Sequence, residues 1–149
     1  MLDVRPATIR DAPQIDRFLE KFRLTALRRR GAQDFLAFSH FVSHTGESGF
    51  DENSLVLLCL QNLDLLGIGA LRLGSAGAAT RASLELFCTD DNNFETDVLQ
   101  LLIGNAENMM RSRGIREVDV MSLPGDQPLK SSLEERGYRA RLLIMHRTL

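Results

Sequence analysis

The sequence has few of the features that membrane-spanning, secreted or disulfide-stabilised proteins depend on. No apolar run approaches the ~20 residues that a membrane-spanning helix needs, so we expect no membrane partner. The opening residues, MLDVRPATIRDA, lack the apolar region of a signal peptide, and we therefore expect a cytoplasmic protein. The chain has only two cysteines, Cys59 and Cys88, and each lies in an apolar, strand-like run. Because an isolated buried cysteine behaves as a small hydrophobic residue, we expect two free thiols.

A strong net charge is also missing. The formal net charge is -2, with 26% charged and 44% hydrophobic residues, the ordinary mix of a globular protein. No global electric field therefore selects nucleic acid or an acidic membrane. The basic run at 28–30 has no interleaved aromatic residues and is typical of a solvated helix end, so we expect no nucleic-acid partner. At 149 residues, the chain is expected to form a single domain over 1–149.

The sequence does contain a change of hydrophobic period along its length. Ile15, Phe18, Leu19 and Phe22 recur on one helical face, whereas the apolar runs at 55–60 and 65–73 are continuous. The order β-α-α-β-β-β-α-β-α-β predicts an α/β fold, a mixed sheet with helices on both faces. The predicted strands are 2–5, 55–60, 65–73, 83–88, 117–121 and 138–149, and the predicted helices run from Thr8 or Asp11 to 30, and over 32–44, 93–113 and 127–136.

Local signals support these elements. The strands 55–60 and 65–73 are expected to form a hairpin, and Gly67 and Gly69 indicate a bulge or a close backbone approach. Thr8 and Asp11 have the spacing of a capping box at the start of the first helix. Gly114 and Gly137 are expected to end the last two helices. The second helix has an apolar side made of Phe35, Phe38, Phe41 and Val42.

The centre of this order is a strand, a polar turn and a long helix, at residues 83–113. Such a unit places a helix N-terminus at the mouth of a sheet, where anionic ligands commonly dock. The turn carries Asp90 and Asp91 and the first helical turn carries Glu95 and Asp97, but neither has a basic residue. These carboxylates complement the helix dipole themselves, and they would oppose a phosphate at the same place.

Two spacings suggest metal ligands, and neither is complete. Acidic and amide residues alternate over 91–97 as at the start of a calcium loop, but Thr96 replaces the required glycine and Leu102 the final acid. His40 and His44 are four residues apart on a predicted helix, without a Glu or Cys partner at a diagnostic spacing. We therefore predict no metal site.

Three stretches in order carry a resemblance to a known family. Residues 4–15 contain VRPAT followed by Asp11, Ala12 and Ile15, residues 84–89 read LELFCT before the long helix, and residues 133–138 read LEERGY. Together they resemble the GNAT superfamily of acyl-CoA-dependent N-acyltransferases over nearly the whole chain. The resemblance implies a GNAT-like fold in which two parallel strands, 83–88 and 117–121, splay apart.

The resemblance also implies a site and a reaction. An amine would attack the thioester of acetyl-CoA or another acyl-CoA directly. The backbone of Phe87, Cys88 and Thr89 would pair with the pantetheine arm. The backbone amides of three residues at the helix N-terminus would hold the pyrophosphate; these are Phe94, Glu95 and Thr96.

Glu85 is the candidate general base, because some family members place one in this strand. The other interpretation of Glu85 is an edge or outward-facing strand carboxylate, since strand alternation places it opposite Leu84 and Leu86.

The sequence departs from the family pattern at the phosphate loop and at the catalytic acid. The family's basic and glycine-rich loop falls on residues 94–99, FETDVL, which contain no glycine and no basic residue. Asn92 and Glu95 have instead the spacing of a self-satisfying helix cap. Leu133 stands where the family has its usual catalytic tyrosine, and Tyr138, the only tyrosine, occupies a packing position. Asp126 is the nearest match to an Asn often found before the closing helix.

Two functions fit these observations. The first is a divergent N-acetyltransferase that acts on an unidentified small-molecule or peptide amine. The alternative is a catalytically silent binding or regulatory module that keeps the scaffold without the chemistry, since a fold does not fix a function. The predicted last strand contains an apolar run at 141–146, an edge that often needs a partner or a cover. A monomer and a homodimer both remain open.

Overall fold

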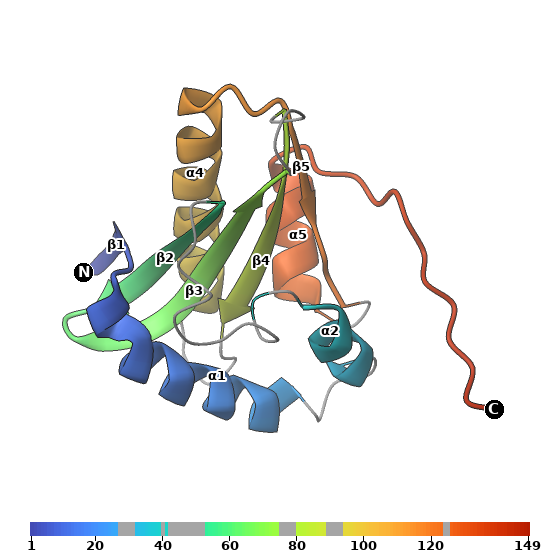
Figure 1. Ribbon diagram of the computed structural model, residues 1–149, viewed down its shortest axis with the longest axis horizontal. Coiled ribbons are helices and arrows are strands. Elements are labelled where there is room, and N and C mark those ends of the chain that lie inside the picture. Colours follow the sequence, from blue (N-terminus) through green and yellow to red (C-terminus); the bar gives the residue numbers. More distant parts are fainter. Residues whose placement is uncertain (27–31, 40, 42–52, 75–79, 89–93, 124–125) are drawn as a thin grey trace.

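The computed structural model describes residues 1–26, 32–39, 41, 53–74, 80–88, 94–123 and 126–149 (Figure 1). Within them it has a five-stranded sheet of order β1-β2-β3-β4-β5 with helices on both faces, as the sequence predicted. The strands are β1 (Leu2–Pro6), β2 (Ser54–Gln61), β3 (Asp64–Leu73), β4 (Arg81–Cys88) and β5 (Glu117–Val120). The helices are a 3-10 turn η1 (Ile9–Asp11), α1 (Ala12–Ala26), α2 (Ala32–Phe38), α4 (Glu95–Ser112) and α5 (Gln127–Glu135).

The sheet is mixed, because its first four strands are antiparallel and its last pair is parallel. β2 and β3 form the predicted hairpin, whose turn contains Asn62 at a positive φ of 57°. Asn tolerates this conformation better than most residues. The β2–β3 register shifts between Cys59 and Leu60, opposite the start of β3. β4 and β5 run in parallel and are joined through α4, which is the crossover that parallel neighbours require.

One face of the sheet is covered by α4 and α5. The buried residues of α4 include Val98, Leu102 and Ile103, each 0% exposed. At Gly67 an added Cβ would lie 2.5 Å from Val98 Cγ1 and 3.0 Å from Leu102 Cδ1, so glycine allows the helix to lie directly on β3. The predicted close backbone approach at this glycine is confirmed.

Both helices on this face end at a glycine, as predicted. Gly114 and Gly137 have φ values of +76° and +91°, which favour glycine. After each glycine the next amide bonds back to the helix, from Ile115 N to Met110 O and from Tyr138 N to Leu133 O, both at 3.0 Å.

The opposite face is covered by α1 and α2. Four residues of α1 that recur on its predicted apolar side are buried; they are Ile15, Phe18, Leu19 and Phe22. The start of α1 is fixed by Asp11, whose carboxylate accepts hydrogen bonds from the Thr8 amide at 2.8 Å and from both terminal nitrogens of Arg5 at 2.8 and 2.9 Å. The predicted capping box is therefore present, and it also ties α1 to β1.

The second helix is shorter than predicted. α2 ends at Phe38, not at 44, and residues 40 and 42–44 lie outside the described residues, His40 and His44 included. Phe38 was expected on the apolar side but is 59% exposed, whereas Phe35 and Phe41 are buried. In a seven-residue helix only a narrow face meets the sheet, and Phe35 occupies it.

The C-terminal segment is the largest correction. The sequence predicted a strand over 138–149, but residues 139–149 have no regular structure and exposed side chains, and they extend away from the body (Figure 1). The sheet ends at β5. An apolar pattern predicts which side chains seek burial, but a strand forms only where a neighbouring strand satisfies its backbone groups. No helix in the described part of the chain is long and apolar enough to cross a membrane.

Candidate active site

The two parallel strands diverge where the sequence predicted. Their ladder runs from the Arg81–Glu117 pair to the Leu84–Val120 pair. Beyond Leu84, β4 continues to Cys88 with partners on the β3 side only, because β5 ends at Val120. The backbone of residues 85–88 thus faces a gap on its β5 side. The C-terminal end of β4 and the N-terminal end of α4 lie at the same end of the sheet (Figure 1).

Hydrogen bonds hold β4 and β5 together at the end where the two strands begin. Thr80 O accepts hydrogen bonds from the amides of Arg116 and Glu117 at 2.8 and 3.0 Å. Arg81 forms a two-point ion pair with Asp119, at 2.6 and 3.0 Å, and the pKa of this carboxyl is lowered, mainly by the Arg81 hydrogen bond. The strands are therefore fixed at one end and separate at the other.

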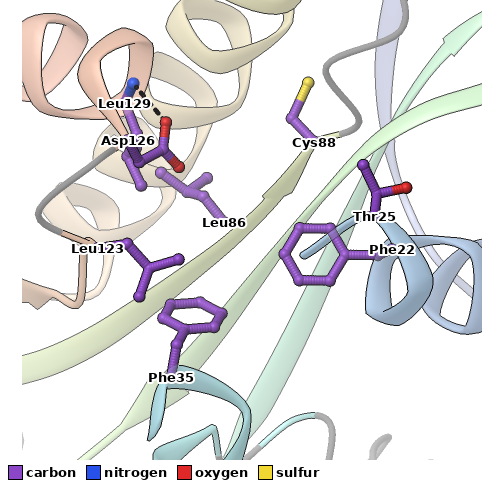
Figure 2. Close-up of a pocket in the computed structure, with 8 residues that line it drawn as sticks. All are labelled: Phe22, Thr25, Phe35, Leu86, Cys88, Leu123, Asp126 and Leu129. Atoms are coloured by element: carbon purple, nitrogen blue, oxygen red, sulfur yellow. Dashed lines mark hydrogen bonds between the residues drawn. The ribbon is translucent and has the colours of Figure 1, made fainter. Parts of the chain in front are cut away.

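A cleft lies beside the open end of β4 (Figure 2), and its volume of about 370 Å³ includes space that is open to solvent. Its walls come from β4, α1, α2, the segment after β5 and α5. Most of the lining is apolar, and Thr25 and Asp126 are the polar contributors among the described residues. The lining residues are Phe22, Thr25, Phe35, Leu86, Cys88, Leu123, Asp126 and Leu129. Asp126, expected only as a weak match to the family's Asn, caps α5 by accepting a hydrogen bond from the Leu129 amide at 3.3 Å.

One wall of the cleft rests on a cluster of aromatic rings. Phe87 is 0% exposed, and its ring centroid lies 5.3 Å from that of Phe22, 6.2 Å from Phe35 and 5.6 Å from Phe41. The Phe22 and Phe87 rings meet edge to face, at 83°, which is a favourable arrangement. The side chain of Phe87 thus packs between β4 and the helices α1 and α2.

Glu85 does not line this cleft. Its side chain lies on the α1–α2 face of β4 and borders a second cavity of about 210 Å³, together with Phe41, Ser54, Val56, Ala70, Leu71 and Arg72. Its Oε2 accepts a hydrogen bond from the Phe41 amide at 2.9 Å. Its Oε1 is buried and has no hydrogen-bond partner among the described residues. Glu85 is half-buried and lies on the opposite face of β4 from Leu84 and Leu86, in the part of the strand that β5 does not pair with. The catalytic role stays a prediction.

The ring cluster stands between Glu85 and the cleft. Phe41 lines the Glu85 cavity, Phe22 and Phe35 line the cleft, and all three rings contact Phe87. The structure therefore brings Cys88 to the cleft, places the Phe87 carbonyl oxygen beside Gly67 of β3, and keeps the Glu85 carboxylate apart from the cleft.

The predicted phosphate seat lies only partly within the described residues. Thr89 and Asn92 fall outside them, and α4 begins at Glu95 with Phe94 in the cap position. Phe94 makes no side-chain cap, and Glu95 and Asp97 occupy the first turn. Among the described residues, none accepts a hydrogen bond from the backbone amide of Thr96. The helix N-terminus presents amides, as any helix does, and surrounds them with carboxylates.

Leu133, which stands where the family has its usual catalytic tyrosine, and Tyr138, the only tyrosine, both pack against the core. Leu133 is 6% exposed in the core beneath α4 and α5. Tyr138 packs against the same core, as predicted, and its hydroxyl donates to Glu107 Oε2 at 3.4 Å. Burial, with a smaller contribution from the Glu107 charge, raises the pKa of Tyr138 to about 12. A less acidic, partly buried phenol is a poor proton donor to the cleft.

Both cysteines are buried thiols that form no disulfide, as predicted. Burial raises the pKa of the Cys59 thiol to about 11, so this thiol is inert at neutral pH. The described residues contain no group of three potential metal ligands, and the turn at 89–93 lies outside them.

Sequence reasoning missed most of the cleft lining. Phe22 and Phe35 were expected to be core residues because of their helical period, and Leu129 and Leu123 gave no signal beyond hydrophobicity. Thr25 is a polar position beside that apolar face. Only the predicted divergence of the two parallel strands pointed to this place.

No protein-family model matches this chain, and no curated protein matches it. Solved structures do match it. A ribosomal-protein-alanine N-acetyltransferase from Brucella melitensis biovar Abortus 2308 is 14% identical, with 100% of both chains covered and a TM-score of 0.66. An aminoglycoside acetyltransferase from an uncultured soil metagenomic sample is 14% identical over 100% of this chain and 99% of that chain, with a TM-score of 0.69.

A transcriptional regulator from Bacillus halodurans C-125 is also similar, with 15% identity over 98% of this chain and 99% of that chain and a TM-score of 0.64. These likenesses show that the chain has the GNAT acetyltransferase fold, as its sequence predicted.

Proposed function

We propose that this chain is a divergent N-acetyltransferase that transfers an acetyl or other acyl group from acyl-CoA to an amine by direct attack. The observation that carries the proposal is the unpaired end of β4, residues 85–88, beside an apolar cleft. Exposed strand backbone pairs with an extended amide-containing chain, and apolar walls exclude water around it. The pantetheine arm of acyl-CoA is such a chain.

The chemistry of the cleft suits the pantetheine arm, because most of its lining is apolar and it lies beside the unpaired end of β4. The backbone of Phe87, Cys88 and Thr89 would hold the arm, with Leu86 and Leu123 covering its methylene groups. Acyl-CoA supplies an activated thioester carbonyl to the site. The chain itself supplies orientation and exclusion of water.

The pyrophosphate fits less well. The amides of Phe94, Glu95 and Thr96 are its expected donors at the α4 N-terminus, where the helix dipole favours an anion. Glu95 and Asp97 oppose that anion, and the described residues of this first turn include no cation. We therefore expect the pantetheine arm to contribute most of the affinity for acyl-CoA, and the nucleotide to contribute little.

Glu85 is the proposed general base. Its buried Oε1 has no donor among the described residues, and a buried carboxylate oxygen without a donor is the natural partner of an ammonium group or a water. Since the ring cluster separates Glu85 from the cleft, this role requires the acceptor amine to approach the thioester from the Glu85 cavity, where a water would pass its proton to Oε1.

The second candidate function is a binding or regulatory module without chemistry. The buried Leu133, the engaged hydroxyl of Tyr138 and the separation of Glu85 from the cleft all favour it. The similar fold of a protein named as a transcriptional regulator supports the same possibility.

Thermal unfolding with and without acetyl-CoA shows whether the chain binds this ligand. Ligand at ~100 times its Kd adds about 2.7 kcal/mol to the free energy of unfolding, which raises the melting temperature of a domain of this size by roughly 5–10 °C. An unchanged melting temperature at millimolar acetyl-CoA contradicts the enzyme. A shift with turnover on an amine panel supports the enzyme, and a shift without turnover supports the module.

The role of Glu85 needs its own variant. Glu85→Gln keeps the shape of the side chain and its acceptor for the Phe41 amide while it removes the base. The expected result is a fall in kcat of roughly 10²–10⁴-fold with the acetyl-CoA thermal shift intact. Unchanged turnover removes Glu85 from the mechanism.

A further inference from the structure

The C-terminal segment carries an apolar run that its own fold does not bury. Leu142, Leu143, Ile144 and Met145 are 84%, 77%, 53% and 84% exposed. Four consecutive large apolar side chains are rarely exposed on a monomeric protein. Contiguous apolar patches of this kind commonly mark interaction sites. A continuous apolar run, unlike an alternating one, is typical of a strand that is covered on both faces.

The molecule offers one edge that suits such a strand. β5 is the last strand of the sheet, so one side of its backbone has no strand beside it in the described structure. The sheet has an apolar layer on each face, under α1 and α2 on one side and α4 and α5 on the other. At β5 itself, Val118 and Val120 pack against the α4–α5 layer, whereas Glu117 and Asp119 are exposed on the other face. A strand added beside β5 would therefore extend the α4–α5 layer with half of its side chains, and the second copy would cover the other half.

The charges of the two elements are opposite. β5 has the sequence EVDV, with exposed Glu117 and Asp119. The segment 139–147 carries Arg139, Arg141 and Arg147 and contains no acidic residue. The two carboxylates share one cation on β4, Arg81, so the edge keeps a net negative charge, and Arg141 of the same chain already contributes to the lowered pKa of Asp119. Opposite charges on neighbouring strands favour pairing, whereas like charges oppose it.

Within one copy the segment does not cover this edge. The amide of Tyr138 is held at the end of α5 by the Leu133 carbonyl at 3.0 Å, and Arg136 is bonded to Glu107 at 2.7 Å. From that fixed start the segment extends away from the body (Figure 1), which leaves the apolar run and the β5 edge both unpaired. Only Arg139, Ala140 and Arg141 separate Tyr138 from the run, and a short connection of this kind favours exchange between copies.

We propose that two copies of this chain form a dimer in which each C-terminal segment adds a strand to β5 of the other copy. A twofold axis allows one such exchange to satisfy both copies at once, which is the usual symmetry of homodimers. The interaction does not depend on acyl-CoA or on the proposed transferase activity.

The test measures the solution mass of the full chain by light scattering across the micromolar range, with hydrogen exchange of residues 141–147. The expected mass is twice the 16.7 kDa of one chain, with slowed exchange in this segment. The variant L143K/I144K should give a mass of one chain with fast exchange. Leu24→Lys is the matched control, because Leu24 is another exposed leucine, on α1, and its variant should stay dimeric.

Three results would overturn the proposal. A monomer with slowed exchange at 141–147 means that the segment folds onto its own β5. A monomer with fast exchange means that the partner is not a second copy. A dimer that persists in L143K/I144K uses another surface.

Discussion

The two faces of the sheet are built in different ways. On the α4 side, aliphatic side chains interdigitate, and Gly67 lets the helix lie directly against β3. On the α1–α2 side, four aromatic rings make the contact around Phe87, and both the Glu85 cavity and one wall of the cleft belong to this side. The difference suggests that one face holds the fold and the other receives ligands.

The largest expected effect is on the closely packed face. Leu102→Ala removes a fully buried side chain from α4 and should lower the free energy of unfolding by about 2–5 kcal/mol, because the site can relax only in part. The melting temperature should fall by roughly 5–15 °C. The increase in melting temperature caused by acetyl-CoA should survive in the folded variant, since Leu102 does not line the cleft. A loss of that increase would contradict the division between the faces.

A smaller effect on the same face is expected at Gly67. Gly67→Ala places a methyl group closer to Val98 and Leu102 than van der Waals contact allows. This overpacking should lower the free energy of unfolding by about 1–3 kcal/mol. Gly69→Ala is the matched control, because its Cβ would lie 3.6 Å from the nearest side chain, an ordinary contact. Urea unfolding of both variants measures the difference. Equal destabilisation would mean that helix and strand are not closely packed at Gly67.

A substitution in the cleft should weaken ligand binding and leave the free energy of unfolding almost unchanged. Thr25→Trp fills the cleft and should weaken acetyl-CoA binding by at least about tenfold, since each tenfold corresponds to ~1.4 kcal/mol. Stability should change little, because Thr25 borders open space. Leu24→Trp, on an exposed neighbour, should leave both properties unchanged. Calorimetric titration gives the affinities, and unchanged binding in Thr25→Trp would place the ligand elsewhere.

The smallest expected effect is at the start of α1. Arg5 holds the pKa of Asp11 well below its usual range, chiefly through the side-chain hydrogen bond. Since the folded pKa is depressed, the stabilisation is present above the unfolded pKa of about 3.9 and is lost as pH falls below it. Arg5 is 42% exposed, so we expect Asp11→Asn to cost at most about 1 kcal/mol at pH 7.

Urea unfolding at pH 7 and at acidic pH measures this Asp11 contribution. The difference between the wild type and Asp11→Asn should shrink at acidic pH. A difference that does not depend on pH would mean that the Arg5–Asp11 pair is not its source.

Much of this fold is predictable from local signals. Helix ends at Gly114 and Gly137, the capping box of Thr8 and Asp11, and the close approach at Gly67 each follow from the chemistry of one or two residues. The crossover from β4 to β5 follows from chain order, and with it the divergence that opens the cleft.

The rest depends on contacts between distant segments. Strand alternation places Glu85 opposite Leu86 but does not show that Phe41, 44 residues away, donates its amide to that carboxylate. Phe22 and Phe35 have the same helical period whether they fill a core or line a cleft. The apolar run at 141–146 predicts burial, and no feature of one chain indicates whether its neighbour belongs to the same copy.

The most direct test of the proposed ligand site follows backbone amide signals of residues 85–88 by NMR during a titration with acetyl-CoA. Pairing of the pantetheine arm with the open end of β4 should shift these amides and slow their hydrogen exchange, with smaller changes at 81–84, where β5 already pairs with β4. Signals at 85–88 that stay unchanged at saturating acetyl-CoA would contradict the assignment of this cleft as the acyl-CoA site.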